Sequence, residues 1–117
     1  MAERIVKRQG DELVCTPTIE NVGNAFDALV RIDIGNETFG VWHEEVRRDV
    51  AFRIPADSVV GYDIILSLPA NMVLGLYDCL CEVWTPGLGE KLAAARFYDE
   101  VRVLEAAVVE ITGMSYE

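Results

Sequence analysis

Apolar and polar residues alternate along most of residues 13–84, in short pieces separated by turn residues. In the clearest piece, apolar side chains occupy every second position: Ala28, Val30, Ile32 and Ile34. The same period recurs around residues 50–54, 62–68 and 77–83. A period of two predicts strands with one buried face, which can be covered only by a second sheet or by closure of the first. The pattern therefore predicts an all-β fold, an antiparallel β-sandwich of about seven strands.

Turn residues divide these pieces at regular intervals, at positions 21–24, 35–36, 55–58, 69–75 and 86–89. Pro17 has no amide hydrogen to give to a sheet. We therefore expect the strand around Pro17 to lie at a sheet edge or to be bulged there.

Residues 90–111 fit two descriptions. Apolar residues recur there at helical spacing and alanine is abundant, which favours a helix. Several of the same residues are β-branched, however, and residues 86–89 form a natural hairpin turn after the preceding strand. We expect a strand, with a C-terminal helix near 90–111 as the alternative. The predicted sandwich spans residues 1–105, and residues 106–117 form a C-terminal strand or linker extension.

The 117-residue chain carries 20 Asp and Glu against 10 Lys and Arg, a net charge of -10. Such a surface repels phosphates, so nucleic acid is not an expected partner. No apolar run reaches the length of a membrane span, and the first residues lack a signal-peptide pattern. The sequence thus predicts a chain made in the cytosol or a domain excised from a longer protein, and leaves its compartment undetermined.

Three cysteines, Cys15, Cys79 and Cys81, are too few and too poorly spaced for a zinc site. Cys79 and Cys81 share one side of a strand, so neither is expected to bond to the other. Three buried thiols are the favoured interpretation, and a disulfide between Cys15 and one of the other two is the alternative.

Two segments carry a resemblance to a known family. The segment Asn21-Val-Gly-Asn-Ala-Phe-Asp-Ala-Leu-Val resembles the N-x-G-x-x-x-A-x-V segment of bacterial and archaeal CARDB (cell-adhesion-related) modules. Residues 74–84 resemble the G-x-Y-x-V strand of those and other immunoglobulin-like domains. The resemblance covers residues 3–104 and implies an immunoglobulin-like sandwich, from a prokaryote or phage, with an adhesive role.

The same resemblance extends to Gly75-Leu-Tyr77-Asp-Cys79, which is similar to the tyrosine corner of immunoglobulin domains. It implies a disulfide between Cys15 and Cys79, the pair that would join the two sheets. No tryptophan follows Cys15 at the immunoglobulin position, where Phe26, Leu29 and Val30 stand instead.

The sequence offers no catalytic set. The sole histidine, His43, has no second histidine at metalloprotease spacing, and no base accompanies the cysteines. Among twenty carboxylates no pair stands out for acid–base work, so we expect a protein that is not an enzyme, with no resident metal or cofactor. Calcium is the alternative metal, because turn residues offer oxygen ligands: Asp27, Asn36, Asp57 and Asp63.

Trp42, His43 and Trp84 are the candidate contact residues for a ligand or partner. Trp84 has the parity of the polar residues of its strand, which predicts an outward-facing ring. We expect a non-catalytic structural or adhesive module of a larger cell-surface or virion assembly, which binds a protein partner or itself, in part through residues 106–117. A carbohydrate-binding module that uses Trp42 and Trp84 as stacking platforms is the alternative, and a hydrolase that uses paired acids is a third, weaker one.

Overall fold

The computed structural model describes residues 5–106 and 113–116 of the chain. Within them almost every element is a strand, joined by turns and one short 3-10 turn, η1 (Pro86–Leu88). The strands are β1 (Ile5–Arg8), β2 (Glu12–Cys15), β3 (Thr18–Asn21), β4 (Phe26–Thr38), β5 (Val41–Ile54), β6 (Ser58–Gly61), β7 (Ile64–Ser67), β8 (Gly75–Trp84) and β9 (Lys91–Leu104). In the described part of the chain, no helix is both long enough and apolar enough to cross a membrane.

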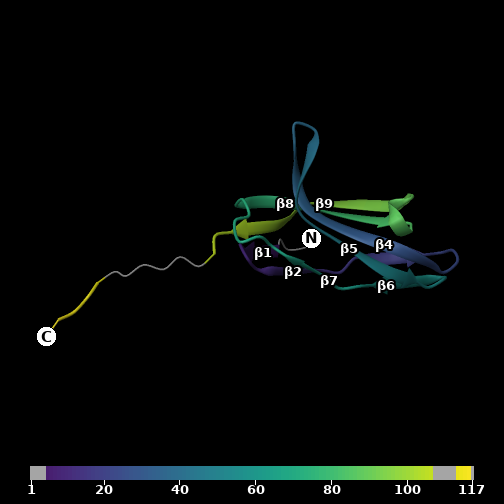
Figure 1. Cartoon of the computed structure of the whole chain (residues 1–117), viewed down its shortest axis with the longest axis horizontal. Helices are drawn as coiled ribbons and strands as arrows, with labels where there is room; N and C mark the ends of the chain where they lie inside the picture. Colours follow the sequence, from purple (N-terminus) through teal and green to yellow (C-terminus); the bar gives the residue numbers. More distant parts are fainter. Residues whose placement is uncertain (1–4, 107–112, 117) are drawn as a thin grey trace.

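The larger layer is a five-stranded sheet in the order β1-β9-β8-β4-β5 (Figure 1). Adjacent strands of this sheet run antiparallel, except that β1 runs parallel to the end of β9. The prediction of an antiparallel sheet is therefore wrong for β1. Parallel pairing at this end follows from topology, because the first and last strands run in the same direction and meet at one edge.

The smaller layer consists of two short ladders, β2 with β7 and β3 with β6. Both ladders keep one register, since Cys15 pairs with Ile64 and Thr18 pairs with Gly61. They are thus one pair of strands interrupted at Thr16-Pro17, where proline has no amide hydrogen to donate. With each interrupted strand counted once, the described chain has seven strands, in agreement with the predicted number of about seven. The expectation of an edge position or an irregularity at Pro17 is confirmed.

The core lies between the two layers. The alternating side of β4 that the sequence indicates is buried, with Val30, Ile32 and Ile34 at most 1% exposed. Leu13, Ile64, Leu66 and Tyr77 close the core from the other strands. The Tyr77 hydroxyl donates a hydrogen bond to the Val73 carbonyl oxygen, the contact expected of a tyrosine corner.

The order β9-β8-β4-β5, with the second layer formed from β2–β3 and β6–β7, corresponds to strands G, F, C, C′, B and E of an immunoglobulin-like sandwich. The all-β sandwich prediction is confirmed. The helix alternative is wrong for Lys91–Leu104, which is β9, because pairing with β8 along its length decides the conformation. Residues 107–111 of that alternative lie outside the described residues.

The β4–β5 hairpin is longer than the sequence indicates, and its tip stands out from the body (Figure 1). The ladder shifts register between Ile34 and Gly35. A Cβ added at Gly35 would lie 2.2 Å from the His43 carbonyl oxygen, so the close approach of the two strands requires glycine.

Candidate functional site

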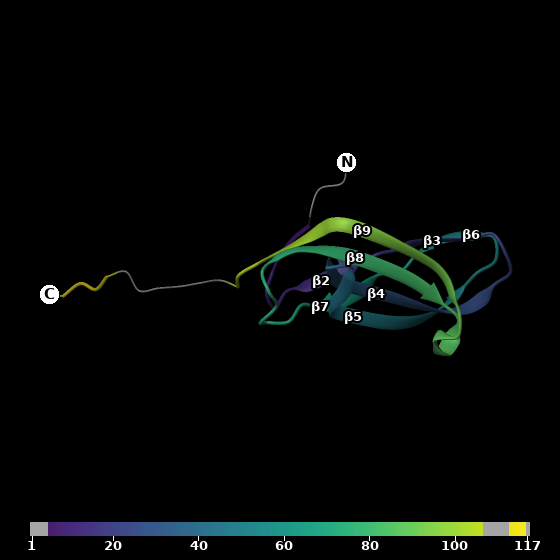
Figure 2. The same ribbon diagram turned by 90° about the horizontal axis from the view of Figure 1, so that it is seen from above.

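The two layers do not overlap fully. On the β5 side two contacts join the layers. The Phe52 and Tyr62 rings stack with their centroids 3.9 Å apart. The Nη1 atom of Arg48 donates a hydrogen bond to the Ile65 carbonyl oxygen at 2.7 Å. The opposite side, between β3 and β9, has no comparable closure among the described residues. In Figure 2 β9 lies along one side of the molecule and β5 along the other.

The inner side of β9 is left uncovered by this offset. Ala93, Ala95 and Phe97 pair with the inward-facing β8 residues Val83, Cys81 and Cys79, so they share the core side of the sheet. Cys81 and Val83 are buried, whereas both alanines are exposed and Phe97 is 48% exposed. Residues that should belong to the core are therefore in contact with solvent over residues 93–97 of β9.

Three adjoining hollows follow this uncovered strip, with volumes of about 500, 200 and 270 Å³. The first and second share Pro17, Cys81 and Phe97, and the second and third share Ile19 and Ala93. They form one elongated depression, here named the β3–β9 groove and defined by these residues: Pro17, Ile19, Cys81, Ala93, Ala95 and Phe97. Its walls are mainly apolar, and Glu20 and Glu100 are the charged residues that line it.

Unpaired strand edges border the groove on both sides. In the described part of the chain, β3 pairs only with β6, and residues 91–97 of β9 pair only with β8. β1 takes the outer edge of β9 only from Val101 onward. Unpaired edges present rows of backbone donors and acceptors, the usual template for an added strand.

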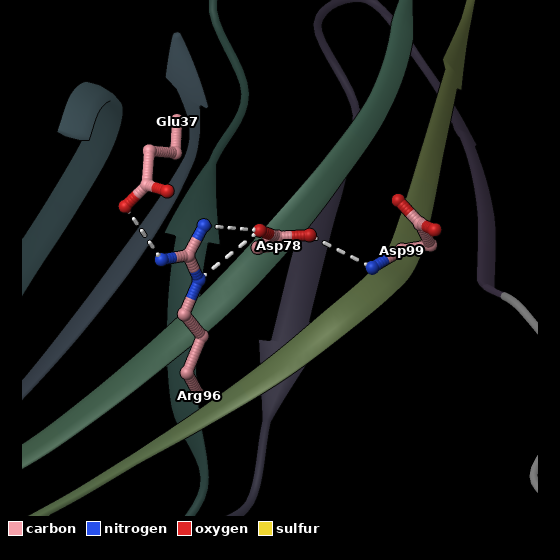
Figure 3. Close-up of polar contacts among 4 residues, drawn as sticks. All are labelled: Glu37, Asp78, Arg96 and Asp99. Carbon is pink, nitrogen blue, oxygen red and sulfur yellow. Dashed lines mark hydrogen bonds and ion pairs between the residues drawn. The ribbon is translucent and has the colours of Figure 1, made fainter. Parts of the chain in front are cut away.

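A polar cluster sets the point where the free edge of β9 ends (Figure 3). The Asp78 carboxylate accepts hydrogen bonds from Arg96 at 2.7 and 3.1 Å and from the Asp99 amide at 2.8 Å. Arg96 also donates to Glu37 at 3.2 Å. Asp99 has a positive φ of 50° and lies where the β8–β9 register shifts. The cluster therefore holds the irregularity that separates the free part of β9 from the part paired with β1.

The three cysteines line the hollow that has the largest volume of the three. A hydrogen bond between the Cys15 and Cys79 thiols lowers the pKa of Cys15 and raises that of Cys79. Burial raises the pKa of Cys81 to about 11. The structure thus brings together Cys15 and Cys79, both present as thiols, and a disulfide between them stays a prediction.

Of the candidate contact residues, Trp42 and Trp84 are half-buried and His43 is exposed in the β4–β5 hairpin. The Arg96 guanidinium lies 5.0 Å from the Trp42 ring, and the Lys91 ammonium lies 5.8 Å from the Trp84 ring. A cation already occupies one approach to each ring, and the three residues do not form one site. The prediction of glycan stacking platforms stays untested, and this geometry does not favour it.

The candidate calcium ligands are dispersed. Asp27 pairs with Arg53 at 3.3 Å, and Asp63 accepts a hydrogen bond from Thr16 at 2.7 Å. Among the residues that the structure describes, no three carboxylate, thiol or imidazole side chains gather closely enough to hold a metal ion.

Comparison with models of known protein families found no match for this chain, and comparison with curated protein sequences found none either. The function has to be argued from the geometry.

The groove was missed at the sequence level, although its signal is present. Ala93, Ala95 and Phe97 share the alternation of Val101 and Val103, but their small side chains also fit a helix. The inner side of β9 is left bare because the second layer does not extend over it. The extent of that layer cannot be read from the local sequence pattern.

Proposed function

We propose that this chain is a non-catalytic assembly module that binds an extended segment of a protein partner, as an added strand, in the β3–β9 groove. Its setting is a larger assembly, such as a cell surface or a virion. The observation that carries the proposal is the bare inner side of β9, where Ala93, Ala95 and Phe97 have core parity but are exposed.

A strand fits this groove better than a compact ligand does. The groove is open along its length and lies between two strand edges with unpaired backbone groups. An added strand would bond its backbone to one edge while every second side chain covers the apolar floor. An added strand would therefore supply both the hydrogen-bond partners that the strand edges lack and the apolar side chains that cover the floor.

The chemistry of the groove supports binding over catalysis. Its walls are apolar, its thiols have raised pKa values at Cys79 and Cys81, and His43 lies elsewhere, in the exposed hairpin. A nucleophile is activated by a base within hydrogen-bonding reach; the sole histidine does not line the groove, whose ionisable residues besides the cysteines are Glu20 and Glu100.

A displayed library of random twelve-residue peptides tests the proposal. We expect the selected peptides to alternate apolar and polar residues. The variant Ala95→Arg, which places a long cation on the groove floor, should weaken their binding at least about tenfold, a loss of about 1.4 kcal/mol. Binding is measured by fluorescence anisotropy of labelled peptides.

Ala51→Arg is the matched control, because Ala51 is exposed on β5 and pairs with Leu29 on the outer side of the sheet. It should bind the selected peptides as the wild type does. The proposal is wrong if no alternating peptides are enriched, or if Ala95→Arg binds them as tightly as Ala51→Arg.

A further inference from the structure

We propose that the strand that fills the β3–β9 groove is the C-terminal segment, residues 106–117, of a second copy of this chain. The inference rests on the proposed function, since it names the partner of the same groove. It is carried by the sequence of the segment, by the place where the chain leaves the body, and by the shape of the groove.

The segment has the side-chain pattern of a strand with one buried face. Ala107, Val109 and Ile111 are apolar on one parity, whereas the other parity carries the polar residues Glu110 and Thr112 together with the apolar Val108. Period-two alternation of this kind is what a half-covered strand needs. The parity that contains Val109 and Ile111 is therefore the one that would face the groove.

The groove offers a floor that complements these side chains. Ala93 and Ala95 leave depth above the sheet, which large β-branched residues such as Val109 and Ile111 would fill. The free edge of β9, residues 91–97, is about 23 Å long at roughly 3.3 Å per residue. Residues 106–117 reach about 40 Å when extended, so the segment is long enough to cover this edge.

After β9, residues 105–106 lie beside Arg8 and Gln9 rather than beside the groove. β9 ends at Leu104, where β1 occupies its outer edge. There Arg8 donates to the Glu105 carbonyl oxygen at 2.7 Å, and the Ala106 amide donates to Gln9 at 3.4 Å. Residues 113–116 lie away from both sheets in both views (Figures 1 and 2), and Met114 and Tyr116 are 73% and 85% exposed.

A groove on one copy and a segment on another make a head-to-tail contact, which joins different surfaces of the two molecules. Such a contact continues into rings or open chains rather than stopping at a symmetric dimer. Each copy carries a net charge of -10, and Glu20 and Glu100 line the groove. Added salt screens this repulsion, so association between copies should strengthen with salt, whereas docking of a basic partner should weaken.

Light scattering on the full chain over a concentration series tests the inference. We expect the wild type to associate beyond the dimer. Ala95→Arg, which blocks the groove, and Ile111→Asp, which places a charge on the groove-facing parity, should each lower the apparent association constant at least about tenfold. Ala51→Arg and Thr112→Asp are the matched controls on the opposite faces, and both should associate as the wild type does.

Mixing the two defective variants gives the sharpest test. Ala95→Arg retains an intact segment and Ile111→Asp retains an intact groove, so the mixture should form a one-to-one dimer that neither variant forms alone. A mixture that stays monomeric overturns the inference. So does a wild type that is monomeric at every concentration, or controls that fail to associate.

The outcomes separate this inference from the proposed function. If the wild type is monomeric but library-selected peptides still bind the groove and lose affinity in Ala95→Arg, the partner is a different protein. If the wild type is monomeric and does not bind such peptides while Ile111→Asp binds them, the segment occupies its own groove. Both results overturn the second-copy inference while the groove remains a strand-binding site; loss of all peptide binding overturns both proposals.

Discussion

Asp33 lies on the outer side of the five-stranded sheet, where it is 5% exposed and its Oδ1 atom has no hydrogen-bond partner among the described residues. Burial raises its pKa to about 7, and the negative charges of Glu44 and Glu82 add to this effect. Above pH 7 the folded protein therefore holds a costly buried carboxylate. Because the folded pKa exceeds the unfolded value near 4, the cost is present above pH 7 and disappears as the pH falls toward 4.

Asp33→Asn removes this cost. The variant should be more stable than the wild type by about 1–3 kcal/mol at pH 8, because a neutral amide is cheaper to bury and can donate to the neighbouring carboxylates. The difference should vanish near pH 4. Urea unfolding across this pH range measures it, with Asp27→Asn, at an exposed carboxylate, as the control. A constant difference between pH 4 and 8 would contradict the assignment.

At the scale of elements, Cys15 of β2 and Cys79 of β8 connect the two layers by a thiol–thiol hydrogen bond at one end of the β3–β9 groove. Cys81, one pair further along β8, is buried and has its pKa raised to about 11. The pair is thus placed for an inter-layer bond, and Cys81 is not part of it.

Treatment with oxidised glutathione should join Cys15 to Cys79 and raise the free energy of unfolding by roughly 2–4 kcal/mol, as disulfides closing long loops do. Peptide mapping identifies the bond, and urea unfolding gives the stability. Cys81→Ser should behave like the wild type and Cys79→Ser should gain nothing. Cross-links that involve Cys81, or no gain in stability, would refute the pairing.

The elements also mark what the sequence can predict. The strand around residues 28–34 can be predicted, because burial of one side of a sheet imposes a period of two on its apolar residues: Ala28, Val30, Ile32 and Ile34. Lys91–Leu104 is ambiguous, because alanines satisfy both periods and pairing with the distant β8 decides between them. β1 is missed since four residues carry too little pattern.

The candidate site was less predictable than the fold. Trp42 and Trp84 stand out by residue type, yet in the structure they lie beside Arg96 and Lys91 rather than in one site. The groove depends on Ala93, Ala95 and Phe97 being left bare by the narrow second layer, a property of the assembled layers rather than of any segment.

At the scale of the whole molecule, five strands face a second layer only two strands wide, and the missing width lies over β9. On the β5 side the layers are closed by the Phe52–Tyr62 stack. The sandwich is thus closed on one side and open on the other. We propose that a strand from another molecule completes its core at the open side.

Hydrogen exchange of the wild type, compared between dilute and concentrated solution, tests this claim most directly. In dilute solution the unpaired amides of residues 18–21 and 91–97 should exchange fast, because both edges of the groove are open to water. In concentrated solution exchange should slow in these two segments together, while the centres of β4 and β8 remain unchanged. The account would be contradicted if residues 91–97 were as protected in dilute solution as β8, or if exchange at neither edge slowed on concentration.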